Sequence, residues 1–179
     1  MNRRHTFGLL AAAAALCALP GASAWAAEDP PPEAVLAALL GQWQGTMSYH
    51  DPAQGARSVN LPTRLYTSLI GPDEVALYFV YADGAGKSRY GYERLRFEFA
   101  SDTLIWIRGA VERTALVGRI VSSTSEANLK RYVVDTTKDG VLTRYTFEFS
   151  PSSFTMTKDE MGAGGQANHL NRYTFQRPA

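Results

Sequence analysis

The chain has 179 residues, of which 45% are hydrophobic, and its 18 basic and 17 acidic side chains leave a formal net charge of +1. This near balance excludes strong electrostatic capture of nucleic acid or of an anionic membrane surface. The one cysteine, Cys17, lies in an N-terminal leader, so thiol catalysis and a cysteine-ligated metal are excluded for the rest of the chain.

Residues 1–27 have the three parts of a secretory signal peptide. Arg3 and Arg4 form the positive region, residues 9–19 form the apolar region, and residues 22–26 hold two small-residue cleavage sites. The apolar run is shorter than the roughly 20 residues that a membrane-spanning helix needs. We therefore expect the leader to be cleaved and the protein to be periplasmic or secreted, without membrane insertion.

The remainder divides into a Pro-rich spacer at residues 28–32 and a single domain at residues 33–179, a size that supports an adequate core. The domain begins with the segment EAVLAALLG, in which apolar residues recur at helical spacing and Gly41 follows as a stop signal. A helix of about two turns is not stable alone. We expect it to pack against an apolar surface.

From Gly41 onward the hydrophobic pattern changes to a period of two. Apolar residues face one side and polar residues the other, which is typical of half-buried antiparallel strands. The pattern predicts roughly ten strands, at residues 41–51, 57–70, 74–82, 88–100, 103–108, 113–122, 128–137, 141–149, 153–160 and 167–177.

Short turn sequences such as ADGAGK, KDG and SPSS separate these strands. They leave no room for the helical crossovers that parallel sheets require. A Greek-key sandwich would need a long return loop, so the sequence favours an all-β, antiparallel up-and-down β-barrel of about 8–10 strands with one short N-terminal helix.

The stretch GQWQG, with Gly41, Trp43 and Gly45, stands at the start of the first strand, and the chain ends in NRYTFQR. This arrangement resembles the calycin group, which includes lipocalins, fatty-acid-binding proteins and nitrobindin-like proteins, and is most similar to exported bacterial lipocalin-like proteins. The resemblance implies that an arginine of the last strand, here Arg177, packs over Trp43. Such a cation–π contact contributes about 1 kcal/mol.

The motif also has a physical interpretation of its own. Trp43 is large enough to close one end of a barrel, Gly41 ends the helix, and Gly45 leaves room for a neighbouring backbone. We therefore expect Gly41, Trp43, Gly45 and Arg177 to be structural, and any ligand to bind toward the other end.

The inward positions of the strands are mostly apolar and aromatic, as in barrels that hold one small ligand. We expect a small hydrophobic or amphipathic molecule to bind without catalysis, in contact with Met47, Leu77, Phe79, Glu93, Leu95, Phe97, Tyr145, Phe147 and Met156. Glu93 either selects a polar head group or lies in water at the rim. In the alternative interpretation the rings fill the interior, and the protein acts through its surface as an interaction module of the cell envelope.

A third interpretation involves His169. Regular alternation puts His169 on one face with Asn171, Tyr173, Phe175 and Arg177. Nitrobindin-like barrels hold haem iron through one histidine of a comparable late strand, so the resemblance implies a haem-binding alternative with His169 as the ligand. A lone histidine on a strand is more often an ordinary rim residue, and we otherwise expect no cofactor and no metal. These face assignments assume regular alternation, which a single bulge reverses.

No catalytic nucleophile is recognisable. The sequence has no Gly-x-Ser-x-Gly motif. Glutamates such as Glu98 and Glu148 alternate with arginines, as expected of cross-strand ion pairs on a solvated face.

Overall fold

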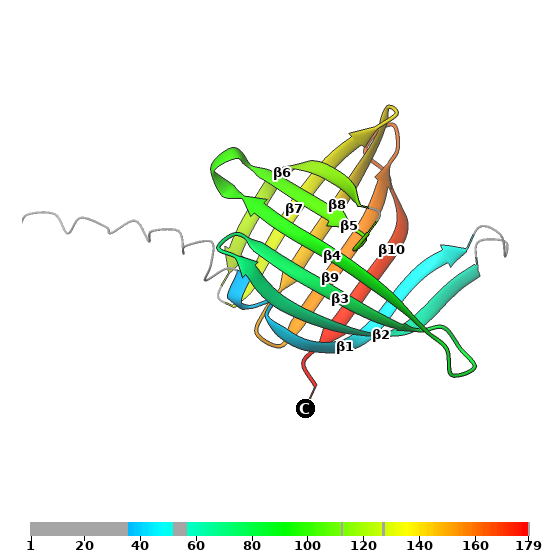
Figure 1. Cartoon of the computed structure of the whole chain (residues 1–179). Helices are drawn as coiled ribbons and strands as arrows, with labels where there is room; N and C mark the ends of the chain where they lie inside the picture. Colours follow the sequence, from blue (N-terminus) through cyan, green and yellow to red (C-terminus); the bar gives the residue numbers. More distant parts are fainter. Residues whose placement is uncertain (1–35, 52–56, 112, 127, 179) are drawn as a thin grey trace, which may run out of the picture.

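The structure, a computed structural model, describes residues 36–51, 57–111, 113–126 and 128–178. Within these residues ten strands form one closed antiparallel barrel, in which each strand pairs with its neighbour in sequence and β1 pairs with β10 (Figure 1). The predicted all-β, up-and-down barrel is confirmed. Because the first and last strands pair with each other, neither remains a free sheet edge.

The strands coincide with those expected from the alternation to within a few residues. They are β1 (Gly41–Asp51), β2 (Arg57–Gly71), β3 (Glu74–Ala82), β4 (Ser88–Glu98), β5 (Thr103–Arg108), β6 (Thr114–Glu126), β7 (Leu129–Lys138), β8 (Val141–Phe149), β9 (Ser153–Met161) and β10 (Ala167–Gln176). The fourth expected strand is shorter than predicted, because Phe99 begins the 3-10 turn η2 (Phe99–Ser101).

The alternating pattern sets which side chains enter the barrel. In β8, Tyr145, Phe147 and Phe149 are buried, whereas the residues between them are only partly buried. The inward rings pack against one another, with Phe154 and Phe175 stacked at a centroid distance of 5.8 Å. One continuous apolar cluster therefore occupies much of the interior.

Part of the expected N-terminal helix lies in the described residues. Leu36 and Ala37 are helical, and the backbone N–H of Leu39 donates to the carbonyl of Leu36 at 2.9 Å. Leu36 and Leu39 are 0% and 1% exposed, so this segment packs on the apolar core as expected. The expected signal peptide, the spacer and residues 33–35 lie outside the described residues.

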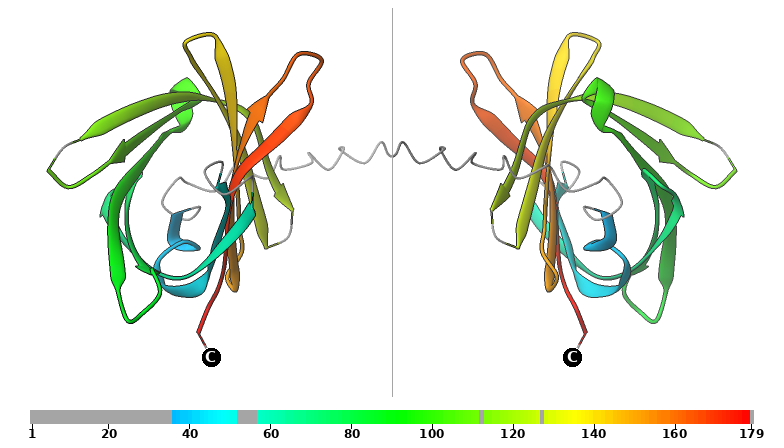
Figure 2. Two further views of the ribbon diagram at one scale, coloured as in Figure 1. Left: turned by 90° about the vertical axis from the view of Figure 1, so that its right-hand side faces the viewer. Right: turned by 90° about the vertical axis from the view of Figure 1, so that its left-hand side faces the viewer.

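The two ends of the barrel differ. The segment after Leu36 lies within the ring of strands (Figure 2). In Figure 1 this blue segment, the β8–β9 turn and the C-terminus lie toward the bottom, whereas the β7–β8 and β9–β10 turns lie at the top. No helix among the described residues is both long and apolar enough to cross a membrane.

Candidate functional site

The lower end of the barrel is closed around Trp43. This side chain is 1% exposed, and its Nε1–H donates to the carbonyl of Leu39 at 2.8 Å. The guanidinium carbon of Arg177 lies 3.9 Å from the Trp43 ring centroid, well inside the roughly 6 Å range of a cation–π contact. Arg177 also donates hydrogen bonds to the carbonyls of Ala38 and Leu40. One side chain thus holds the N-terminal segment against the tryptophan.

The two glycines of the motif lie where larger residues would collide. A Cβ on Gly45 would stand 1.9 Å from the carbonyl oxygen of Thr174 on β10, and Gly41 has a φ of +114° and faces Arg177. Gly45 is therefore required by the close approach of β1 and β10, and Gly41 by its backbone conformation. The contacts of this end are those of a structural closure.

A small cavity lies among the inward side chains of five strands, and Trp43 is not one of its lining residues. Its volume is about 90 Å³. The lining residues are Glu93 of β4, Trp106 and Arg108 of β5, Tyr145 of β8, Met156 and Lys158 of β9, and Asn171 and Tyr173 of β10. Three of these residues, Glu93, Arg108 and Lys158, have acidic or basic side chains. The cavity therefore differs chemically from the apolar core beside it.

Glu93 lies inside the barrel rather than at its rim in water. Its Oε2 accepts a hydrogen bond of 2.7 Å from the indole N–H of Trp106. Burial raises the pKa of the Glu93 carboxyl above its usual value, while the charge of Arg108 and the Trp106 hydrogen bond act in the opposite direction. Since burial is the largest effect, Glu93 holds its proton more tightly than a carboxyl in water.

Two cations share this cavity. The guanidinium carbon of Arg108 lies 4.1 Å from the centroid of the Trp106 ring, and Arg108 Nε is buried with no hydrogen-bond partner in the described part of the chain. Burial, and then the nearby charge of Arg108, lower the pKa of Lys158, while the charge of Glu160 acts in the opposite direction. Neither cation forms an ion pair with any described residue. The two positive charges therefore lie close together without a contacting counter-charge.

Tyr173 brings a hydroxyl group to the cavity lining, and this hydroxyl pairs with that of Tyr81, which is not a lining residue. The hydroxyl oxygens of Tyr81 and Tyr173 are 3.2 Å apart, so one donates to the other. Burial raises the pKa of both phenols, and each stays neutral at ordinary pH. One of the two protons is used in the mutual hydrogen bond, which leaves the second available to another acceptor.

The residues predicted to contact a ligand separate into two groups. Glu93, Tyr145 and Met156 line the cavity. The rest do not line it: Met47 is half-buried against the core, and the fully packed residues, at most 1% exposed, are Leu77, Phe79, Leu95, Phe97 and Phe147.

Five lining residues were not predicted: Trp106, Arg108, Lys158, Asn171 and Tyr173. The alternation of inward and outward residues contained a signal for two of them, Arg108 and Lys158. Arg108 shares the parity of Leu104 and Trp106, and Lys158 shares that of Met156. A charged residue at an inward position of a strand was therefore the feature that could have indicated the polar cavity.

The predicted face of His169 is wrong. The pairing of β10 with β9 shifts register between His169 and Asn171, which leaves Leu170 as an extra residue. This bulge reverses the alternation, so His169 lies on the outer face, where its Nδ1 is 2.8 Å from Asp159 Oδ1 and its side chain is 42% exposed. Among the described residues no group of three or more His, Asp or Glu is placed to hold a metal.

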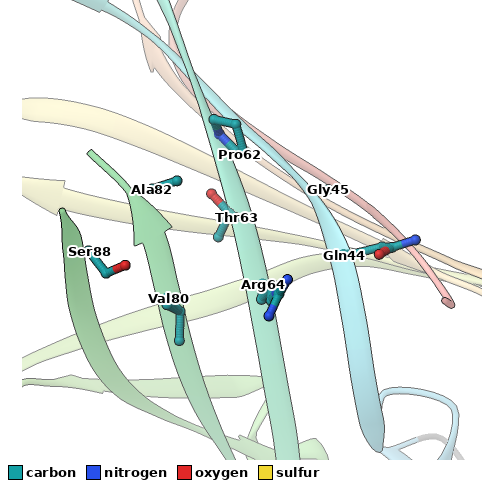
Figure 3. A pocket seen from close by; sticks show the side chains of 8 residues that line it. All are labelled: Gln44, Gly45, Pro62, Thr63, Arg64, Val80, Ala82 and Ser88. Atoms are coloured by element: carbon teal, nitrogen blue, oxygen red, sulfur yellow. The ribbon is translucent and has the colours of Figure 1, made fainter. Parts of the chain in front are cut away.

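A second, more open hollow of about 560 Å³ lies against strands β1 to β4 (Figure 3). It is lined by Gln44, Gly45, Pro62, Thr63, Arg64, Val80, Ala82 and Ser88. Beside it, Tyr66, Tyr78 and Tyr90 are 39%, 44% and 66% exposed. Tyr66 pairs directly with Tyr78 across the sheet, so these rings form a row on the barrel surface.

Comparison with known proteins bears on the fold. No family model matches the sequence, and no curated protein matches it. Among solved structures, Rv2717c from M. tuberculosis is similar with a TM-score of 0.60 and 13% identity, covering 84% of this chain and 99% of that one. The S-type phycobiliprotein lyase CPES from Guillardia theta is similar with a TM-score of 0.57 and 11% identity, covering 84% and 94%. These likenesses, together with the closed ten-stranded barrel, support a calycin-like fold for this chain.

Proposed function

We propose that the chain is an exported small-molecule-binding barrel that holds one compact amphipathic ligand in the cavity beside Glu93, without catalysis. A single observation carries the proposal: polar groups from separate strands converge on one cavity in an otherwise apolar interior. Ligand sites of this kind combine apolar walls with a few convergent polar groups and perturbed pKa values.

The size of the cavity bears on the class of ligand. At about 90 Å³ it is smaller than the roughly 300–1,000 Å³ of sites for drug-sized molecules. Trp106, Tyr145 and Met156 supply apolar walls, while Glu93, Arg108 and Lys158 supply charge. These features favour a compact molecule with a polar group over a long lipid. The leader, residues 1–27, is the basis for proposing that binding takes place outside the cytoplasm.

The methionines allow a direct test. In protein labelled with ¹³C at the methionine methyl groups, Met156 reports on the cavity, whereas Met161 at the end of β9 reports on the exterior. Ligands found by screening a library of small fragments should shift the Met156 signal and leave Met161 in place. Binding that moves only Met161, or a library without any fragment that moves Met156, would contradict the proposal.

A second candidate function is an interaction module of the cell envelope, and the exposed tyrosine row favours it. Tyrosine is enriched at protein interfaces, since its ring offers a large contact area and its hydroxyl a polar contact. If the surface carries the function, Tyr78→Ser combined with Tyr90→Ser should abolish co-purification of an envelope partner and leave fragment binding at Met156 unchanged. Unaltered co-purification would contradict this candidate. The haem alternative gains no support, because His169 is bonded to Asp159 on the outer face.

A further inference from the structure

We propose that the ligand of the interior cavity is a compact organic carboxylate, with its carboxylate group held between Arg108 and Lys158. The inference rests on the proposed function, in which this cavity binds a small molecule. It adds the charge and the chemical class of that molecule.

The charges in the cavity are unequal. Arg108 and Lys158 contribute two positive charges, and Glu93 is the one acidic residue among the lining residues. Glu93 forms no ion pair with either cation, although the charge of Arg108 acts on it, and its Oε2 accepts the hydrogen bond of Trp106. Glu160 attracts Lys158 without forming an ion pair with it. Partly buried charges without a contacting counter-charge are costly. A bound anion supplies the missing negative charge, whether Glu93 is ionised or protonated.

The hydrogen-bond donors and acceptors of the cavity are also unequal in number. Arg108 and Lys158 carry only donors, Asn171 offers an amide N–H₂ group, and the tyrosine pair has one spare hydroxyl proton. The buried Nε of Arg108 has no acceptor in the described residues. On the acceptor side, Trp106 occupies Oε2 of Glu93, which leaves Glu93 Oε1 and the amide oxygen of Asn171, fewer groups than the N–H donors of Arg108 and Lys158. The cavity therefore has an excess of donors, which a ligand with several acceptor oxygens satisfies.

The shape of the cavity favours an organic carboxylate over an inorganic anion. Stacking on Trp106 uses one face of the Arg108 guanidinium and leaves its N–H groups, which lie in its plane, for a planar partner such as a carboxylate. Trp106, Tyr145 and Met156 form apolar walls that inorganic phosphate would not use. The volume of about 90 Å³ is below the roughly 150 Å³ of a cavity that holds benzene, so the organic part is small.

The experiment compares charged and neutral ligands of the same shape. Acetate, butyrate and benzoate are each titrated against the ¹³C-methionine-labelled protein, in parallel with acetamide, butyramide, benzamide and inorganic phosphate. We expect at least one carboxylate to shift Met156 and to bind at least tenfold more tightly than its amide and than phosphate. Lys158→Met and Arg108→Gln should each weaken that carboxylate at least tenfold.

Arg172→Met is the matched control. Arg172 lies on β10 between Asn171 and Tyr173, which line the cavity, and its exposed side chain points to the opposite face. This variant should bind the carboxylate like the unchanged protein. Because methionine matches the length of lysine without its charge, Lys158→Met is expected to fold, and its thermal unfolding verifies this.

The possible outcomes distinguish a failure of the carboxylate proposal from a failure of the proposed ligand-binding function. Amides that shift Met156 as strongly as the carboxylates do would preserve the interior site and overturn the anionic ligand. If phosphate binds as tightly as any carboxylate, the proposal that the ligand is an organic molecule is wrong. If none of the seven compounds shifts Met156 while library fragments do, the carboxylate inference fails and the ligand-binding barrel stands; if fragments fail as well, both fail.

Discussion

At the scale of single residues, the cavity places charge where the fold gains nothing from it. Lys158 is partly buried, and its pKa is lowered by burial and by the charge of Arg108. No described residue forms an ion pair with its side chain. Binding-site residues often lower the free energy of unfolding in this way, because the groups that contact a ligand lack hydrogen-bond or charge partners when it is absent.

Lys158→Met should therefore raise the free energy of unfolding at pH 7. The charged form of Lys158 is disfavoured in the folded state, so the unfolded state binds the proton more strongly at pH values between the folded pKa and the ordinary value of 10.5. In that interval the stability of the unchanged protein rises with pH, and the advantage of the methionine variant shrinks. Urea unfolding at pH 7 and pH 10 measures both effects. A variant less stable than the unchanged protein at pH 7 would contradict the argument.

Glu93→Gln should show the opposite pH dependence. The pKa of Glu93 is raised in the folded state, so the stability from its protonated form is present below the ordinary value of 4.5 and is lost as pH rises through the folded pKa. Glutamine keeps the acceptor for Trp106 and has no proton to lose. Relative to the unchanged protein, Glu93→Gln should gain stability between pH 4 and pH 7.5.

Urea unfolding across this pH range tests the Glu93 prediction. Glu148→Gln is the control, because Glu148 lies on the outer face in an ion pair with Arg131. A constant stability difference between Glu93→Gln and the unchanged protein at every pH would show that burial does not govern Glu93.

At the scale of elements, Arg177 joins three parts of the chain that local structure does not connect. It packs on Trp43 of β1, donates to the carbonyls of Ala38 and Leu40 before β1, and its Nε donates to the carbonyl of Pro151 in the β8–β9 turn. Two carbonyls at the end of the N-terminal segment, those of Ala38 and Leu40, thus find their donors in one guanidinium.

Arg177→Met should lower the free energy of unfolding by about 2–4 kcal/mol, since a cation–π contact and charge-assisted hydrogen bonds are lost together. Chemical denaturation measures the loss. Arg172→Met, at an exposed arginine of β10, the strand that ends just before Arg177, should change stability by less than about 0.5 kcal/mol. Equal effects of the two variants would show that Arg177 does not hold the closed end together.

At the scale of the whole molecule, one strand pair closes the barrel. β1 pairs with β10 from Gln44 opposite Gln176 to Tyr49 opposite Asn171, and Gly45 lies in this contact. A closed barrel leaves the backbone of β10 little freedom to move away, because β9 holds its other edge.

Gly45→Ala should therefore destabilise the protein by about 3 kcal/mol or more, because the new Cβ would meet backbone atoms of Thr174 and Phe175. Gly71→Ala is the matched control in a strand, since its Cβ would stand at an ordinary 3.5 Å from Glu74. Urea unfolding of both variants tests the prediction. A Gly45→Ala variant as stable as Gly71→Ala would mean that the β1–β10 contact is looser than the structure indicates.

The sequence by itself determined the barrel, because alternation and turn signals are local properties that each strand carries alone. It also pointed to the closed end, since a tryptophan between two glycines and a late arginine have few other uses in a small barrel. It put Glu93 on the face of Leu95 and Phe97 by parity, but whether Glu93 lines the interior or lies in water at the rim was decided by the structure.

Only the tertiary structure decided which inward residues form the candidate site. Phe97 and Phe147 have the inward orientation expected of them, yet packing against other rings buries them in the core. Arg108 and Lys158 are distant in sequence and meet because the strand register brings them to one level of the barrel. His169 turned outward because one extra residue in β10 reversed the alternation. Alternation repeats within a strand and is readable from it, whereas register, bulges and packing are relations between strands, and these set the chemistry of the cavity.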